Sequence, residues 1–125
     1  MHHTGSIDTF FRTTNITNIN TIYSRHASDD DFIDLYISTD GSVTFRVEGS
    51  SGVEQLSTPI SSVSVDSWHY VSVTWSWNST HTNFNLQVDA DSAVSLTGAD
   101  GLVVEDSKSY TGYLAIAFDL NAQLA

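Results

Sequence analysis

The chain has 125 residues, of which 15 are acidic and 4 are basic, giving a net charge of −11. This length fits one domain, and so negative a field disfavours binding to nucleic-acid phosphates and to anionic membrane surfaces. There is no cysteine, which excludes thiolate metal sites and cysteine nucleophiles, and no apolar run approaches the about 20 residues of a membrane span. Cations, calcium above all, suit the surplus carboxylates.

The amino terminus, residues 1–6, lacks the basic and apolar segments of a signal peptide. We expect residues 1–6 to be a tag-like or flexible end and residues 7–125 to form a single domain. The sequence favours an extracellular module of a longer parent protein over a cytosolic chain.

Alternation of apolar and polar residues predicts strands throughout the chain, and no segment follows a helical period. Asp40-Gly41 predicts a tight turn between two of these strands, because both positions tolerate positive φ. Many short strands separated by turns indicate an all-β antiparallel sandwich or barrel. In chain order, the expected strands are 7–12, 19–24, 32–38, 42–47, 53–57, 69–75, 84–88, 94–96, 102–104 and 113–118.

The core is predicted from the faces of these strands. His69 shares the inward face of its strand with three apolar residues, so we interpret it as a core histidine with a satisfied hydrogen bond rather than as a ligand or a base. The opposite face of that strand carries Trp68 and Tyr70. The predicted inward residues are Ile33, Leu35, Ile37, Val43, Phe45, Val47, His69, Val71, Val73, Trp75, Phe84, Leu86 and Val88.

The segment 66–75, DSWHYVSVTW, resembles the D-x-W-H-x-V-x-V strand of laminin-G-like domains. The resemblance covers residues 7–118 and implies a jelly-roll of two antiparallel sheets with an extracellular recognition role. The outermost strands of the family are short or missing here, and the terminal cysteine pair of many members is absent. Segments similar to other strands of the family are 11–14, 21–24, 32–37, 40–45, 84–89 and 113–114.

The resemblance also implies a calcium site at the rim of the sandwich, built from two side chains and backbone carbonyls. Asp106 falls at the second side-chain position. The first falls near Ser51, where no carboxylate stands, so Glu48 or Glu54 would have to take its place. Calcium takes six to eight oxygen ligands, so half a site would bind weakly. A solvated acidic loop is the alternative.

A second acidic segment is Asp29-Asp30-Asp31, with Asp34 close by. It lacks the glycine and the terminal glutamate of an EF-hand loop. The segment therefore predicts a solvated turn between strands, with a weak cation site as the alternative.

Candidate ligand-binding residues are Trp77, Asn78 and Ser51. An exposed indole at Trp77 can stack on a sugar or anchor a protein interface, and packing onto its own hairpin is the alternative. Asn15-Ile16-Thr17 and Asn78-Ser79-Thr80 are N-glycosylation sequons. The loops expected to carry recognition are 27–31, 49–54, 76–82 and 105–109.

Catalysis finds no support, because G-x-S-x-G, H-E-x-x-H and P-loop motifs are all absent. We expect a non-catalytic, extracellular or cell-surface module that mediates adhesion or receptor recognition through its rim loops, with calcium as the candidate cofactor. A lectin-like carbohydrate-binding domain is one alternative. A structural subunit of a fibre or surface assembly, pairing edge strands into homo-oligomers, is another. The expected partner is an extracellular protein or a glycan, without nucleic acid or membrane insertion.

Overall fold

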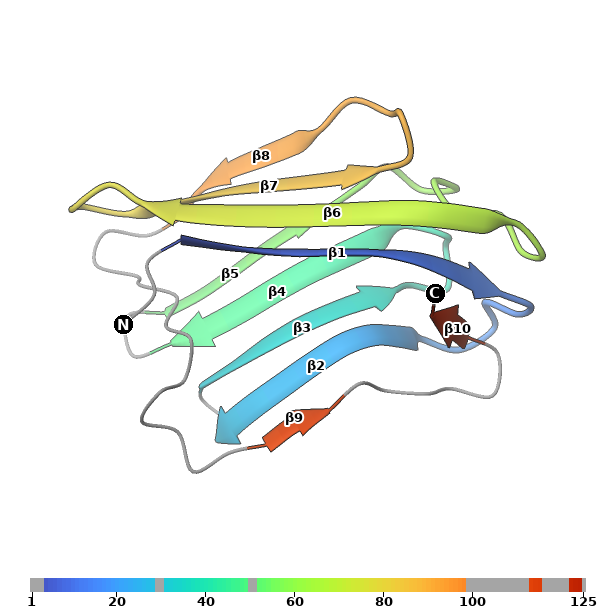
Figure 1. Cartoon of the computed structure of the whole chain (residues 1–125), viewed down its shortest axis with the longest axis horizontal. Helices are drawn as coiled ribbons and strands as arrows, with labels where there is room; N and C mark the ends of the chain where they lie inside the picture. The colour runs from blue at the N-terminus through green and yellow to red at the C-terminus, as the bar shows by residue number, and fades with distance from the viewer. Residues whose placement is uncertain (1–3, 29–30, 50–51, 99–112, 116–121, 125) are drawn as a thin grey trace.

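The computed structural model describes residues 4–28, 31–49 and 52–98, and the backbone of residues 113–115 and 122–124 (Figure 1). These residues form antiparallel strands, and no helix that could cross a membrane occurs among them. The strands are β1 (Thr4–Thr13), β2 (Asn20–Ser28), β3 (Asp31–Ile37), β4 (Val43–Gly49), β5 (Gly52–Ser57), β6 (Trp68–Trp77), β7 (Thr82–Val88), β8 (Val94–Thr97), β9 (Tyr113–Ala115) and β10 (Ala122–Leu124).

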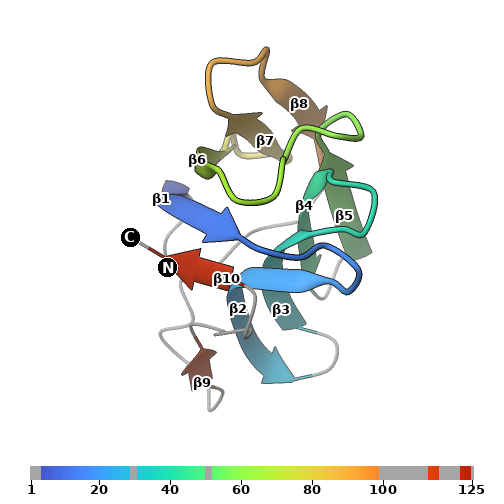
Figure 2. The same ribbon diagram turned by 90° about the vertical axis from the view of Figure 1, so that its right-hand side faces the viewer.

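Two five-stranded sheets face each other, as Figure 2 shows end-on. The first, here called the β6 sheet, has the order β10-β1-β6-β7-β8. The second, the β3 sheet, has the order β5-β4-β3-β2-β9. The antiparallel all-β sandwich predicted from the alternation is confirmed.

The first and last strands differ from the prediction. Strand β1 begins at Thr4 rather than Ile7, because residues 4–6 pair in register with residues 74–76 of β6. Strand β10 was not expected, and it pairs with the end of β1 on the other side. The predicted strand 102–104 lies outside the described residues.

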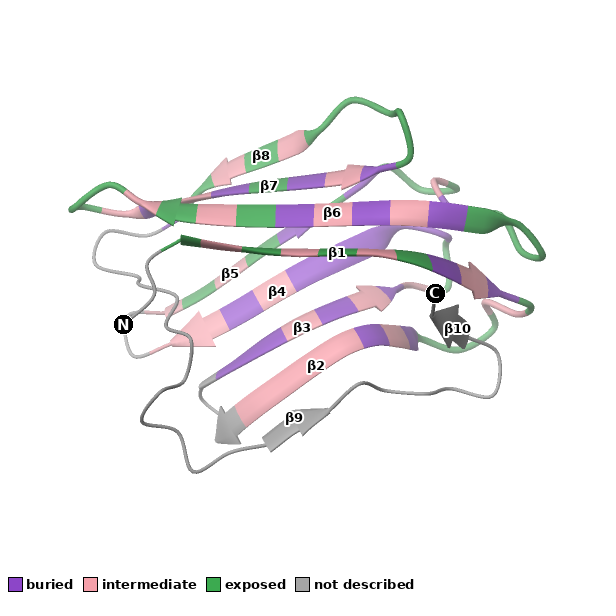
Figure 3. Ribbon diagram, viewed as in Figure 1, coloured by how far each residue is buried: buried purple, intermediate pink, exposed green. Residues whose placement is uncertain are grey.

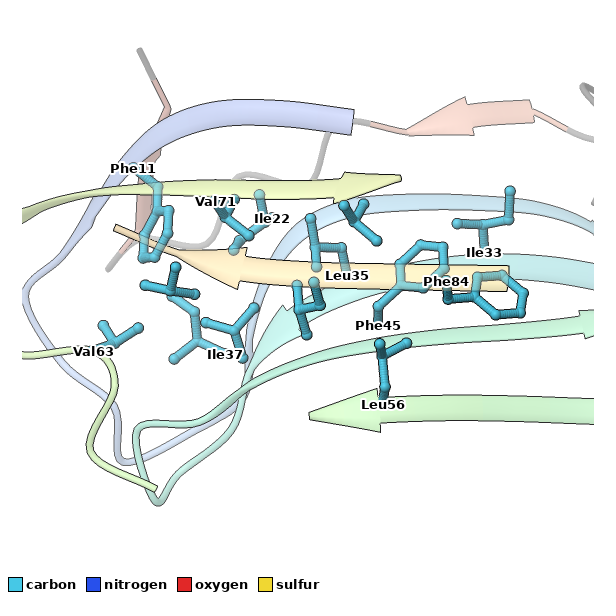
Figure 4. Close-up of a cluster of buried hydrophobic side chains, with 14 of the residues drawn as sticks. Phe11, Ile22, Ile33, Leu35, Ile37, Phe45, Leu56, Val63, Val71 and Phe84 are labelled. Atoms are coloured by element: carbon cyan, nitrogen blue, oxygen red, sulfur yellow. The ribbon is translucent and has the colours of Figure 1, made fainter. Parts of the chain in front are cut away.

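The core lies between the sheets and follows the predicted alternation (Figures 3 and 4). Leu35 and Phe45 of the β3 sheet and Val71 and Val73 of the β6 sheet are fully buried. Phe45 also stacks on Trp75, with ring centroids 6.0 Å apart. Fully burying one such side chain stabilises the fold by about 1.5–3 kcal/mol, so this double layer holds the sandwich together without a disulfide.

The Asp40-Gly41 turn sets the register of the central hairpin. Gly41 has a φ of +77°, in the left-handed region that glycine adopts without strain. Asp40 accepts hydrogen bonds from the Ser42 hydroxyl and the Ser42 N–H, at 2.7 and 2.9 Å. These bonds hold the pKa of the Asp40 carboxyl below its ordinary value, because they stabilise the charged form.

Connections alternate between the two ends of the sandwich. One end, at the right of Figure 1, carries the β1–β2, β3–β4, β5–β6 and β7–β8 connections. The other end, at the left, carries the β2–β3, β4–β5 and β6–β7 connections. Three of the four predicted recognition loops therefore lie at one and the same end.

Candidate functional site

Two of the predicted ligand-binding residues, Trp77 and Asn78, lie at this left end. Trp77 is not in a loop: it is the last residue of β6, pairs with Thr82 and is only partly exposed. Asn78 follows it and is exposed, and its Oδ1 accepts the N–H groups of Thr80 and His81 at 3.1 and 3.0 Å. Asn78 thus closes the β6–β7 turn, next to a half-buried indole. Ser51 lies outside the described residues.

The candidate calcium ligands are not brought together in the described part of the chain. Glu48 pairs with Val53, on the outer face of the β3 sheet. Glu54 has the parity of Leu56, whose side chain is in the core, so it projects from the inner face. The two glutamates therefore stand on opposite faces of one sheet, and Asp106 lies outside the described residues. Within the described ranges, no group of three or more His, Asp or Glu side chains could hold a metal ion.

A different cluster lies on the outer face of the β3 sheet. Because core residues alternate with outward ones along β2, β3 and β4, the register places Ser24, Asp34 and Arg46 side by side in one row. In the next row toward the left end, His26 pairs with Phe32, and Phe32 pairs with Glu48 of β4. We call Ser24, His26, Phe32, Asp34 and Arg46 the outer-face cluster, and Glu48 lies at its edge.

Asp34 is the centre of the outer-face cluster. Its Oδ1 accepts a hydrogen bond from the Ser24 hydroxyl at 2.6 Å and lies 2.9 Å from His26 Nε2. Its Oδ2 lies 3.2 Å from the same ring nitrogen. Since a carboxylate can only accept, the His26 ring N–H is the donor. Both oxygens of Asp34 are thereby directed to β2 and away from β4.

An aromatic layer lies beside this carboxylate. The His26 ring stacks on Phe32, with centroids 4.8 Å apart and an interplanar angle of 19°. The Arg46 guanidinium carbon lies 5.2 Å from the Phe32 ring centroid, a cation–π distance. Phe32 is therefore only 8% exposed although it is on the outward face. His26 and Asp34 keep 35% and 24% of their side-chain surface exposed, so the cluster is open to a ligand.

Arg46 has no acidic partner among the described residues. It stands directly opposite Asp34 in the β3–β4 register, yet the ion pairs formed within the described ranges are Arg12–Asp66, His26–Asp34 and His69–Asp89. Arg46 takes no part in these ion pairs, so its N–H groups stay available. A guanidinium offers five donors in a planar fork that suits a carboxylate or a pair of hydroxyls.

A Ser-His-Asp arrangement occurs at the opposite end of the molecule. His69 Nδ1 lies 2.7 Å from Asp89 Oδ2, and His69 Nε2 lies 3.3 Å from the Ser64 hydroxyl. Since a carboxylate accepts, Nδ1–H is the donor to Asp89, and Nε2 also lies 3.2 Å from the backbone N and 3.0 Å from the carbonyl oxygen of Ser64. The ring thus ties the β5–β6 connection to β6, and the prediction of a buried, hydrogen-bonded histidine is confirmed.

Asp89 completes that link through both of its oxygens. Burial alone would raise the pKa of the Asp89 carboxyl, but hydrogen bonds from His69 and from the Tyr70 N–H outweigh it and lower that pKa. Asp89 also has a φ of +54°, in a region that aspartate and asparagine tolerate better than most residues.

Sequence reasoning missed the outer-face cluster. Serine, histidine, aspartate and arginine at outward positions of a strand are usual, and none stands out alone. A signal was nonetheless present: the Asp40-Gly41 turn fixes the hairpin register, and that register places Asp34 opposite Arg46. The bond from His26 to Asp34 required the β2–β3 pairing, in which register shifts occur between Thr21 and Tyr23 and between His26 and Ser28.

Comparison with known proteins adds three findings. A family model described as the Laminin G domain matches residues 11–122. A search of curated protein sequences found no match. Two similar solved structures are of the CBM40 domain of the Ruminococcus gnavus IT-sialidase. In one, CBM40 is bound to alpha2,3 sialyllactose: the TM-score is 0.72 at 16% identity, over 90% of this chain and 62% of that chain.

In the other structure, CBM40 is bound to alpha2,6 sialyllactose: the TM-score is 0.74 at 15% identity, over 95% of this chain and 67% of that chain. The chain thus spans less than two thirds of the length of the first structure. Likeness at this level of identity shows the jelly-roll fold.

Proposed function

This chain belongs to the laminin G domain family, and from that premise we propose that it is a glycan-binding module whose binding surface is the outer-face cluster of the β3 sheet. The coarser assignment, a non-catalytic binding module, agrees with the family and with the CBM40 likeness. The setting we propose is the cell surface or the extracellular space.

The observation that carries the proposal is the combination of charge and ring at one exposed place. The His26 ring stacks on Phe32, and the Arg46 guanidinium lies over the Phe32 ring. Asp34, on the strand between those of His26 and Arg46, adds a carboxylate. Sugars are recognised by several polar groups that converge on their hydroxyls, beside a flat apolar contact. Exposed Gln55 pairs with Arg46 on the next strand and extends the polar row.

The CBM40 structures support the class of ligand. Both have nearly the same chain path over most of this chain, and both were determined with a sialyllactose bound. A glycan is therefore the partner we propose, in preference to the Trp77–Asn78 site expected from the sequence. At that site the indole is half-buried and the Asn78 amide oxygen is used within its own turn.

A protein partner is the second candidate function, and one observation favours it. Phe10 and Trp68 are each 54% exposed on the outer face of the β6 sheet, where Phe10 contacts Tyr70 at a centroid distance of 5.0 Å. Exposed aromatic side chains gathered on one face are typical of protein interfaces. Adhesion or receptor recognition would use this face.

A glycan array separates the two candidates. We expect the purified chain to bind a subset of glycans, His26→Ala to lose most of that binding, and Trp68→Ala to retain it. Both substitutions change exposed or half-exposed side chains, and thermal unfolding checks that each variant is folded. Glycan binding lost in Trp68→Ala but kept in His26→Ala would move the site to the β6 sheet. A chain that binds no glycan contradicts the proposal.

A further inference from the structure

We infer that the ligand of the outer-face cluster is a glycan with a single carboxylate, held by Arg46, and not a polysulfated or otherwise polyanionic chain. The inference rests on the proposed function and names the chemical class that this surface selects.

Arg46 makes no ion pair in the described ranges, although an acidic residue stands directly opposite it. A cross-strand Asp–Arg pair would ordinarily neutralise both groups, and Asp34 stands directly opposite Arg46. Here the carboxylate is bound at 2.6 Å by Ser24 and at 2.9 Å by His26 instead. Within the described ranges Arg46 makes its contact with the Phe32 ring alone. Arg46 is therefore a cation without an acidic partner in the described ranges, and an incoming carboxylate can pair with it.

The Phe32 ring restricts where the Arg46 guanidinium can lie. Contact with an aromatic face restricts the side chain before any ligand arrives, so less conformational entropy is lost on binding. A guanidinium over a ring uses its charge and not its hydrogen-bond donors, so the Arg46 N–H groups remain free for a ligand. Such a fork matches the two oxygens of a carboxylate, and charge-assisted bonds of this kind are about twice as strong as neutral ones.

The number of anions that the face can accept is set by its arginines. Of the three arginines, Arg12 is on the other sheet and is paired with Asp66 at 3.2 Å. Arg25 has the parity of Tyr23, which packs against the core. Arg46 is thus the one arginine directed outward from the β3 sheet. A chain of sulfates would meet one arginine and, on the same face, the carboxylates of Asp34 and Glu48, so its further charges would be repelled.

The experiment compares matched ligands by isothermal titration calorimetry. The acidic probes are sialyllactose and a glucuronate-terminated disaccharide. Their methyl esters have the same shape without the charge, and heparin is the polyanion. We expect at least one acid to bind about ten- to a hundredfold more tightly than its ester, and heparin to bind more weakly than that acid.

Arg46 variants test the residue. Arg46→Gln should remove the preference for acid over ester, and Arg46→Lys should keep part of it, because the charge stays while the fork is lost. Arg12→Gln is the matched control, since it removes an arginine from the opposite sheet and should leave the preference unchanged. Thermal unfolding confirms that each variant is folded.

The outcomes separate the inference from the proposed function. Equal binding of an acid and its ester, or binding of neutral glycans only, overturns the inference and leaves glycan binding in place. Heparin binding tighter than both acids overturns the exclusion of polyanions. An acid preference that survives in Arg46→Gln overturns the assignment to Arg46. Binding to no glycan on the array removes the proposed function itself.

Discussion

His69 and Asp89 are joined by a hydrogen bond of 2.7 Å between Nδ1 and Oδ2, which connects the start of β6 to the residue that follows β7. The other oxygen of Asp89 accepts the Tyr70 N–H at 2.9 Å. Through Nε2, the same imidazole reaches the β5–β6 connection at Ser64. One carboxylate and one ring thus fix three segments at the right end of the sandwich.

Replacing Asp89 by asparagine should lower the free energy of unfolding by about 1–2 kcal/mol at pH 7, less than the full value of a hydrogen bond to a charged group because the Asp89 side chain is 41% exposed. Asparagine tolerates the positive φ of this position, so the substitution isolates the charge. Urea unfolding of both proteins measures the difference. Asp91→Asn, exposed in the same turn, is the control and should change little.

The effect of Asp89 should depend on pH with a defined sign. The pKa of Asp89 is lowered in the folded chain from the ordinary value of 3.8, so its contribution is complete above that value and is lost as the pH falls through the lowered pKa. The stability difference between the native chain and Asp89→Asn should therefore shrink in acid. A difference that stays constant from pH 7 to the acid limit would contradict this assignment.

Gly5→Ala tests whether residues 4–6 belong to the fold. A Cβ at Gly5 would clash with Cζ2 of Trp75, so the indole must move from its stack on Phe45. Overpacking of this kind costs about 1–3 kcal/mol. We expect a lower unfolding midpoint and a shifted tryptophan fluorescence. Ser6→Ala, at the exposed neighbouring position, should leave both the midpoint and the fluorescence unchanged. If Gly5→Ala also changed neither, residues 4–6 would not be part of the sheet.

Calcium binding stays a prediction of the sequence, and it depends on Asp106. If the rim site exists, millimolar calcium should raise the thermal midpoint relative to chelator, because a ligand at a hundredfold excess over its Kd stabilises by about 2.7 kcal/mol. Asp106→Ala should remove this shift and Asp30→Ala should not. An identical midpoint with calcium and with chelator would end the calcium hypothesis.

Asn78 is the sequon that the structure presents best. It is exposed in the β6–β7 turn, while Asn15 is only partly exposed in the β1–β2 connection. Expressed through a eukaryotic secretory pathway, the chain should gain a glycan at Asn78. Mass spectrometry before and after enzymatic deglycosylation detects it, and Asn78→Gln should remove it. A glycan found on Asn15 alone would reverse this ranking of the two sites.

The core strands are the part of the fold that the sequence predicted best. The alternation correctly predicted the burial of Val71, Val73, Phe84 and Leu86. Every second side chain of a strand points to the same face, so apolar residues with this spacing are buried together. Pairing between distant strands could not be predicted, since β1 and β10 contain no turn that fixes their register. For the same reason the strand start at Thr4 was missed.

The candidate site was less accessible to sequence reasoning. Trp77 follows Trp75 with the same parity, yet the nearby Asn78-Ser79 signalled a loop, so the indole was expected to be exposed. The outer-face cluster depends on three strands lying side by side. A hairpin turn predicts one of the two pairings, Asp34 opposite Arg46, while the contact of His26 with Asp34 depends on the irregular β2–β3 register.

The position of β1 between β6 and β10 has a consequence for how the chain folds. Its partners are β6, which ends at Trp77, and β10, which ends at Leu124. During synthesis from the amino terminus, β1 therefore emerges long before either strand that pairs with it, and Phe11 stays exposed to solvent until then. Pairings so far apart in sequence slow folding and prolong the exposure of apolar surface. The β2–β5 meander can form first, and we expect closure of the β6 sheet to limit the folding rate.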